Sequence, residues 1–149
     1  MLKKLLLTMA TGTLLSSNVW ADDLSGTWQQ IDDKTGAAKV IIQIRQEADK
    51  SYSGTIVKVT PRPGYQAREL CQNCPAPFTN QPILGMKILQ GLKHVAGTGT
   101  YNHGRVIDPL AGKIYNAKIR LNSSKRRLTL RANLGVSVLG RNQTWIRID

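Results

Sequence analysis

The feature that most constrains the fold is an alternation of apolar and polar residues that recurs along most of the chain. Over residues 113–121, Tyr115, Ala117 and Ile119 share one face, and the residues between them are polar. Because successive side chains of a β-strand point to opposite faces, this period of two indicates strands with one buried face. No segment beyond residue 21 keeps the 3.6-residue period of an amphipathic helix. The sequence therefore predicts an all-β fold.

Turn residues divide the alternating segments into short strands. We expect strands at residues 26–32, 38–46, 51–60, 83–89, 95–101, 105–108, 113–121, 127–132 and 141–148. Gly85 is expected to form a bulge, and residues 102–104, Asn-His-Gly, a turn. Five of the six prolines fall between residues 61 and 82 and predict a long loop, because proline cannot donate to a strand ladder.

Eight to ten short antiparallel strands in sequence form either a sandwich or a closed barrel. We expect a small barrel, because closure removes the sheet edges. The first expected strand carries Trp28, and the last carries Trp145 and Arg147. Pairing the first strand with the last would bring two indoles and an arginine together. An arginine stacked on a tryptophan face contributes about 0.5 to 2 kcal/mol and would plug one end of the barrel.

These residues resemble a known pattern. Gly26-x-Trp28 on a first strand, with an arginine near the end of the last, resembles the signature of lipocalins and fatty-acid-binding proteins (calycins). Residues 25–148 resemble more specifically the bacterial family called domain of unknown function 2147, through the Gly-Thr-Trp opening, residues 54–58, residues 107–115 and the ending at residues 128–147. Ala132-Asn133 replaces a Gly-aromatic pair common in that family. The resemblance implies an exported lipocalin-like β-barrel and no established activity.

The N-terminal segment is typical of a secretory signal peptide. Lys3 and Lys4 precede an apolar stretch at residues 5–15, and Val19-Trp20-Ala21 fits a cleavage site. The stretch is shorter than the roughly 20 residues that span a bilayer. We therefore predict a signal peptide at residues 1–21, a single barrel domain at residues 22–149, and a periplasmic location without a transmembrane segment.

The charge is strongly basic and unevenly distributed. Without the two leader lysines, 19 basic residues face nine acidic ones. From residue 109 onward there are nine basic residues and one acidic residue, Asp149. Such a surface attracts anions, for example lipid headgroups or a cell-wall polymer, or it is simply solvated. A nucleic-acid partner is not expected, because the chain lacks a basic helix and is poor in aromatic residues for stacking.

The two cysteines, Cys71 and Cys74, predict a local disulfide in an oxidising compartment. Two alternatives remain open. His94 and His103 would complete four ligands for zinc, although the spacing is irregular. The second alternative is a redox-active pair of cysteines, although no helix N-terminus is expected in this proline-rich loop to stabilise a thiolate. We predict no resident metal and no cofactor.

Few residues suggest catalysis. Asp108 and Lys113 flank one turn beside Tyr115, and an acid, an ammonium and a phenol could transfer protons. Asp before proline more commonly accepts backbone N–H groups at a turn, and His103 is typical of an exposed turn. No hydrolase, zinc-protease or phosphate-loop motif is present. An enzyme that uses Asp108, Lys113 and His103 is therefore the third of three hypotheses.

The leading hypothesis is a cavity inside the barrel. Inward-facing aromatic side chains with one or two arginines would bind an amphipathic anion such as a fatty acid, unless they only fill the interior. The candidate ligand-binding residues are Trp28, Tyr115, Arg131, Arg141, Trp145 and Arg147. The chain is thus predicted to be an exported, non-enzymatic protein that binds a lipid or anionic envelope-related ligand. The second hypothesis is a module that docks on anionic envelope surfaces through its C-terminal basic half.

Overall fold

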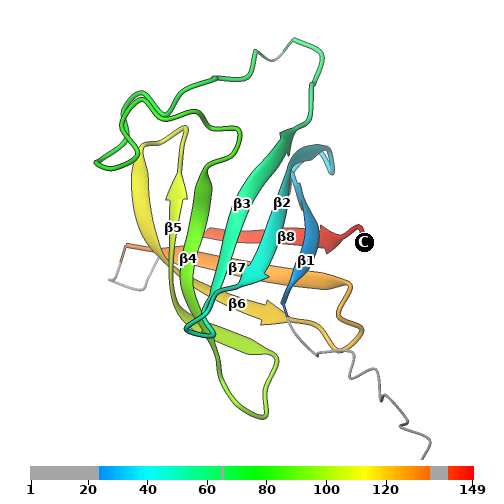
Figure 1. The fold of residues 1–149 in the computed structure, drawn as a ribbon. Helices are drawn as coiled ribbons and strands as arrows, with labels where there is room; N and C mark the ends of the chain where they lie inside the picture. Colours follow the sequence, from blue (N-terminus) through cyan, green and yellow to red (C-terminus); the bar gives the residue numbers. More distant parts are fainter. Residues whose placement is uncertain (1–23, 65, 135–140) are drawn as a thin grey trace, which may run out of the picture.

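Eight antiparallel strands form the protein, which is described here from a computed structural model over residues 24–64, 66–134 and 141–149. The strands are β1 (Gly26–Ile31), β2 (Ala38–Gln46), β3 (Tyr52–Val59), β4 (Lys87–His94), β5 (Thr100–Asp108), β6 (Lys113–Leu121), β7 (Arg127–Asn133) and β8 (Arg141–Arg147). Each strand pairs with the next, and β1 pairs with β8 to close a barrel (Figure 1). The all-β barrel prediction is confirmed. No helix in the described part of the chain is long and apolar enough to cross a membrane.

The alternation sorts side chains between the interior and the outer face as expected. In β7 the buried residues Leu128, Leu130 and Ala132 alternate with exposed ones, and β6 shows the same pattern from Ala117 to Leu121. The two strands pair in register, with Ile119 opposite Leu130. Burial of these apolar side chains stabilises the fold by about 25 cal/mol per Å² of apolar surface.

One end of the barrel is closed by Trp28 and Arg147, two of the three side chains that were expected to meet there; the third, Trp145, lies opposite Gln30 further along the β1–β8 ladder. Trp28 lies opposite Arg147 in the β1–β8 ladder, and the guanidinium carbon stands 4.4 Å from the indole ring centroid. The indole N–H of Trp28 donates to the carbonyl of Leu24 at 3.0 Å. Arg147 donates to the carbonyls of Ser25 and Lys125 at 2.7 and 2.8 Å. We call this end the closed end.

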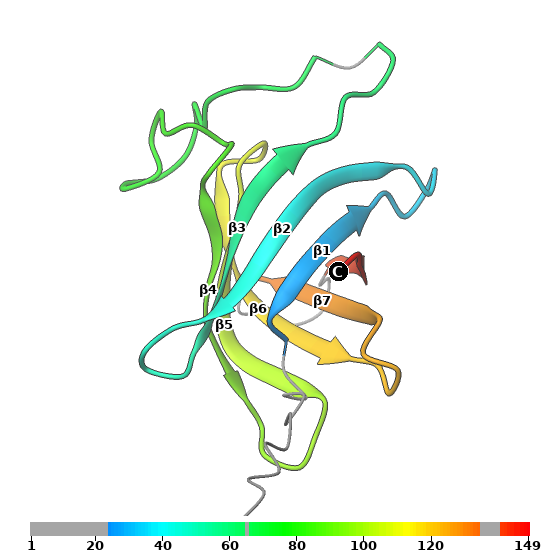
Figure 2. The ribbon, with the colours of Figure 1, turned by 45° about the vertical axis from the view of Figure 1, so that its right-hand side comes forward.

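The opposite end is covered in part by the proline-rich segment, whose described residues, 60–64 and 66–86, arch above β3, β4 and β5 (Figures 1 and 2). Cys71 and Cys74 form a disulfide, as predicted, and both sulfurs lie within 3.8 Å of the Pro109 carbonyl. A Cβ on Gly112 would overlap the carbonyl oxygen of Asn73. The glycine therefore lets the disulfide loop pack directly on the β5–β6 turn.

The predicted positions of the fourth and fifth strands were wrong. β4 continues to His94, the connection runs through residues 95–99, and β5 passes through the expected turn at residues 102–104. Val95 suggested a strand, but it is partly exposed beside a glycine-rich turn. His103 has a positive φ of 64° at a bulge, and Gly104 follows it. A Cβ on Gly104 would lie 2.6 Å from Leu92, so this glycine permits close packing inside a strand.

Candidate functional site

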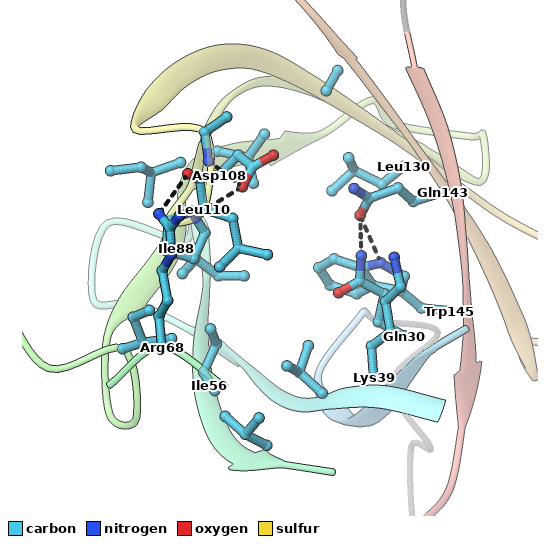
Figure 3. Close-up of a pocket in the computed structure, with 18 of the residues that line it drawn as sticks. Gln30, Lys39, Ile56, Arg68, Ile88, Asp108, Leu110, Leu130, Gln143 and Trp145 are labelled. Atoms are coloured by element: carbon cyan, nitrogen blue, oxygen red, sulfur yellow. Dashed lines mark hydrogen bonds between the residues drawn. The ribbon is translucent and has the colours of Figure 1, made fainter. Parts of the chain in front are cut away.

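A pocket of about 510 Å³ lies at the open end of the barrel. Inward-facing residues of the strands line it, together with parts of the segment at residues 60–83 and the β5–β6 turn (Figure 3). Its volume is within the roughly 300 to 1,000 Å³ of small-molecule sites. The barrel is therefore not completely filled by its own side chains.

One part of the pocket wall is apolar. Ile56 on β3, Ile88 on β4 and Val106 on β5 line it, and each is less than 10 % exposed. Leu130 and Trp145 add apolar surface from β7 and β8, across the pocket from Ile88 (Figure 3). These positions are inward-facing because of the period of two along each strand. An apolar group in the pocket would lose contact with water on several sides.

A polar group faces this wall. We call Gln30, Gln143 and Trp145 the glutamine cluster. The side-chain carbonyl of Gln143 accepts from Nε2 of Gln30 at 2.9 Å and from the Trp145 indole N–H at 3.3 Å. In Figure 3 the cluster lies across the pocket from Ile88 and Leu110. The hydrogen-bonding groups of the cluster thus face apolar side chains across the pocket.

Charged residues gather where the strands and loops reach the open end. The charged lining residues are Lys39, Arg62, Arg68, Asp108 and Arg141. Four of these five are cationic, so the entrance favours an anion. Arg68 lies 3.5 Å from the Leu110 carbonyl, to which it donates through Nη1.

Two carboxylates, Asp108 in the lining and Asp32 beside Lys39, have local partners. Asp32 forms an ion pair with Lys39 at 3.0 Å, and this contact holds the pKa of Asp32 far below its usual value, with help from the N–H groups of Lys34 and Thr35. Asp108 accepts from the backbone N–H groups of Leu110 and Ala111 at 2.9 and 3.1 Å. The carboxylate of Asp108 therefore organises the turn, as the sequence analysis suggested.

The pocket brings together three of the six predicted ligand-binding residues. Tyr115, Arg141 and Trp145 line it. Trp28 and Arg147 lie at the closed end instead and contact each other. Arg131 is exposed on the outer face, because its neighbours Leu130 and Ala132 occupy the inward positions of β7.

The residues of the catalytic hypothesis do not converge on the pocket. His103 is exposed at the β5 bulge and does not line it. Lys113 is exposed at the start of β6 and is also outside the lining. Asp108 alone of the three lines the pocket, where its carboxylate holds the turn.

The zinc alternative is not supported. Both cysteines are in the disulfide, and no group of three or more His, Cys, Asp or Glu side chains suited to a metal occurs within the described ranges. His94 lines a second hollow of about 610 Å³ between the β4–β5 loop and the β6–β7 turn. Its Nε2 lies 2.6 Å from the Thr98 carbonyl, and its ring lies 4.9 Å from that of Tyr101. His94 is thus engaged locally.

Two glutamines and three of the cations in the pocket lining were not predicted from the sequence. A signal for the glutamines was present. Gln30 follows Trp28 by two residues and Gln143 precedes Trp145 by two, so each shares a face with an inward-pointing indole. Arg62 and Arg68 had no such signal, because they lie in an aperiodic loop.

The chain matches a protein-family model along the barrel. The model of the family described as "Uncharacterized protein conserved in bacteria (DUF2147)" matches residues 26–147. The chain belongs to this family. The match confirms the resemblance and covers all eight strands of this DUF2147 domain. A search of curated proteins finds no match.

The fold of this DUF2147 domain is similar to that of a solved lipocalin-family structure. Protein HP1028 from the human pathogen Helicobacter pylori is described as belonging to the lipocalin family. It superposes with a TM-score of 0.69 and 19% sequence identity, over 85% of this chain and 84% of HP1028. The lipocalin-like architecture is therefore confirmed.

Proposed function

We propose that this chain is an exported, non-enzymatic protein whose pocket binds an amphipathic anion. The observation that carries the proposal is the pocket itself, which combines an apolar wall inside the barrel with cations at its entrance. Lipocalin-like barrels of eight strands have room for one small ligand. The likeness of the fold to HP1028 is consistent with this role.

The pocket favours one orientation of such a ligand. Its apolar part would lie among residues such as Ile56, Ile88 and Val106, where burial contributes about 25 cal/mol per Å². Its anionic group would stay near the entrance, beside Arg68 and Arg141. Arginine suits this task, because its planar fork donates two parallel hydrogen bonds to a carboxylate or phosphate.

A binding role agrees better with the site than catalysis does. Asp108, the one carboxylate of the lining among the residues that the structure describes, accepts two backbone hydrogen bonds. The other candidate acid–base groups, Lys113 and His103, lie outside the pocket lining. Catalysis would need a base within hydrogen-bond reach of the substrate.

Export is supported by the sequence alone. We propose that cleavage after Ala21 releases the domain into the periplasm. The mass of the protein purified from the exporting host tests this, because cleavage leaves a chain that begins at Asp22. Native mass spectrometry of the same sample would reveal a retained ligand as additional mass. A full-length mass would overturn the proposed cleavage.

Calorimetric titration with decanoate tests the binding function. Arg141→Ala is expected to weaken binding about tenfold, since a charge-assisted hydrogen bond contributes about 1.5 to 3 kcal/mol. The matched control is Arg131→Ala, which removes the same side chain from the outer face of β7. Equal weakening by both variants, or no decanoate binding by the unmodified protein, would contradict the proposal.

A second function, docking on an anionic bilayer, is favoured by one observation. Lys118 and Arg131 are directly opposite in the β6–β7 ladder, and both are exposed. Arg120 and Arg127 are exposed on the same outer surface, and neither strand contains an acidic residue. We call these four residues the cationic face. Like charges opposed across strands repel each other, and an anionic surface would relieve the repulsion.

Sedimentation with vesicles tests this second function. Binding to phosphatidylglycerol vesicles, its absence with phosphatidylcholine and its loss in moderate salt are expected. Replacing Lys118 and Arg131 by glutamine should weaken the binding. The control replaces Arg45 and Lys58, exposed on β2 and β3, by glutamine. Equal loss in both double variants would indicate that only net charge matters and would refute a localised docking face.

A further inference from the structure

The hydrogen bonds of the glutamine cluster determine which atoms face the pocket. The indole N–H of Trp145 can only donate, so the Gln143 atom that it contacts must be the carbonyl oxygen. The same oxygen accepts from Gln30. The amide NH₂ of Gln143 is therefore on the other side of the group, and Figure 3 shows it directed into the pocket.

The orientation of Gln30 follows from that of Gln143. Because its Nε2 donates to the Gln143 carbonyl, its own carbonyl oxygen is directed elsewhere, and in Figure 3 it too points into the pocket. Within residues 24–64, 66–134 and 141–149, neither the Gln143 NH₂ nor the Gln30 oxygen has a hydrogen-bond partner. The pocket thus presents a donor and an acceptor from two paired side chains.

We infer that the glutamine cluster recognises an amide group of the ligand. An amide has an acceptor and a donor on adjacent atoms, so its carbonyl would accept from Gln143 while its N–H donates to Gln30. A carboxylate only accepts, and it would leave the Gln30 oxygen facing another oxygen. The inference rests on the proposed binding function and specifies its ligand class as an amide-bearing amphiphile whose anionic group stays near the entrance.

The surroundings make this recognition selective. Trp145 is 1 % exposed, and the apolar side chains of Ile88 and Leu110 lie across the pocket from the cluster (Figure 3). A polar group that enters such a site without a partner loses its hydrogen bonds to water, so a missing hydrogen bond costs more than it would at the surface. Sites built for hydrogen bonding reject analogues that lack the matching group.

Three probes with the same alkyl chain test the inference by calorimetric titration of the unmodified protein. Decanamide has both donor and acceptor, methyl nonyl ketone replaces the NH₂ by a methyl group, and decanoate is the anionic acceptor. We expect decanamide to bind about tenfold more tightly than the ketone, from one additional hydrogen bond in an apolar site. Equal affinities for decanamide and the ketone would overturn the inference.

Gln30→Met removes the acceptor and keeps an unbranched side chain of similar length. The ratio of ketone to decanamide dissociation constants should fall to about one in this variant. The control, Gln90→Met, alters an exposed glutamine on β4 and should keep the ratio of the unmodified protein. An unchanged ratio in Gln30→Met would refute the role of Gln30.

The outcomes of these titrations distinguish failure of amide recognition from failure of the proposed binding function. If decanoate binds and the ratio in the unmodified protein is one, the amide inference fails and the binding function stands. If none of the three probes binds, both fail. Should Gln30→Met not fold, the comparison of decanamide with the ketone in the unmodified protein still decides the inference.

Discussion

Replacing Arg147 by alanine is expected to lower the free energy of unfolding by about 3 kcal/mol. The side chain stacks on Trp28 and donates to the carbonyls of Ser25 and Lys125, so its loss removes the stacking and both of these hydrogen bonds. The stacking contributes about 0.5 to 2 kcal/mol. Each hydrogen bond from a charged donor contributes about 1.5 to 3 kcal/mol when water is excluded.

The sum of these contributions is reduced by solvent. The Arg147 side chain remains 15% exposed, so water replaces part of each lost hydrogen bond. Its ion pair with Asp149, at 3.6 Å, adds little, because that carboxylate is 46% exposed. A net loss of about 3 kcal/mol corresponds to a decrease of roughly 10 °C in melting temperature for a domain of this size.

Urea denaturation followed by circular dichroism would measure this loss without relying on the fluorescence of Trp28. Arg131→Ala is the control, because exposed positions change stability by about 0.5 kcal/mol or less. The stability of Arg147→Lys should lie between those of Arg147→Ala and Arg131→Ala, because lysine keeps the charge but lacks the planar guanidinium that donates to two carbonyls. Similar stabilities for Arg147→Ala and Arg131→Ala would refute the closing role of Arg147.

Three further predictions concern the open end. Replacing Cys71 and Cys74 by serine should lower the free energy of unfolding by about 2 kcal/mol or less, because the disulfide closes a short loop, and it should weaken decanoate binding. Unchanged affinity for decanoate would contradict a role of the disulfide loop at the pocket. Gly112→Ala should destabilise the protein in thermal unfolding, because the new methyl would overlap the Asn73 carbonyl, and a neutral result would refute that packing. Because the pKa of Asp32 is lowered in the folded state, its carboxylate stabilises the fold at pH values above its usual pKa of 3.8, and this contribution is lost as the pH falls through the folded-state pKa. Asp32→Asn should therefore make the free energy of unfolding depend less on pH in the acid range. An unchanged pH dependence in this variant would exclude the contribution.

The parts of the fold that were predictable are those in which local periodicity and packing agree. β6 and β7 alternate without interruption between water and core, so their bounds follow from the sequence within one residue. The pairing of Trp28 with Arg147 followed from the need to remove sheet edges. β4 and β5 were less predictable, because Gly104 suggests a turn in the sequence but is required in the fold by its close packing against Leu92 within a strand.

The pocket was predictable only in part for a related reason. Trp145 and Tyr115 lie at inward positions of regular strands, and alternation identified both. Alternation alone does not reveal that Gln143 turns its carbonyl toward two donors, since this depends on β1 and β8 being neighbours. The position of Arg68 depends on how residues 60–86 fold back over the barrel, which no local pattern encodes.

The closed end also determines how the molecule can be attached to something else. The described chain enters β1 beside the point at which β8 leaves the barrel: the backbone N–H of Thr27 donates to the Asp149 carboxylate at 2.9 Å. Both points lie at the end opposite the pocket. A linker, affinity tag or sensor surface joined at either point would therefore hold the barrel with its entrance facing away from the support. Immobilised protein should consequently bind decanoate as well as free protein does.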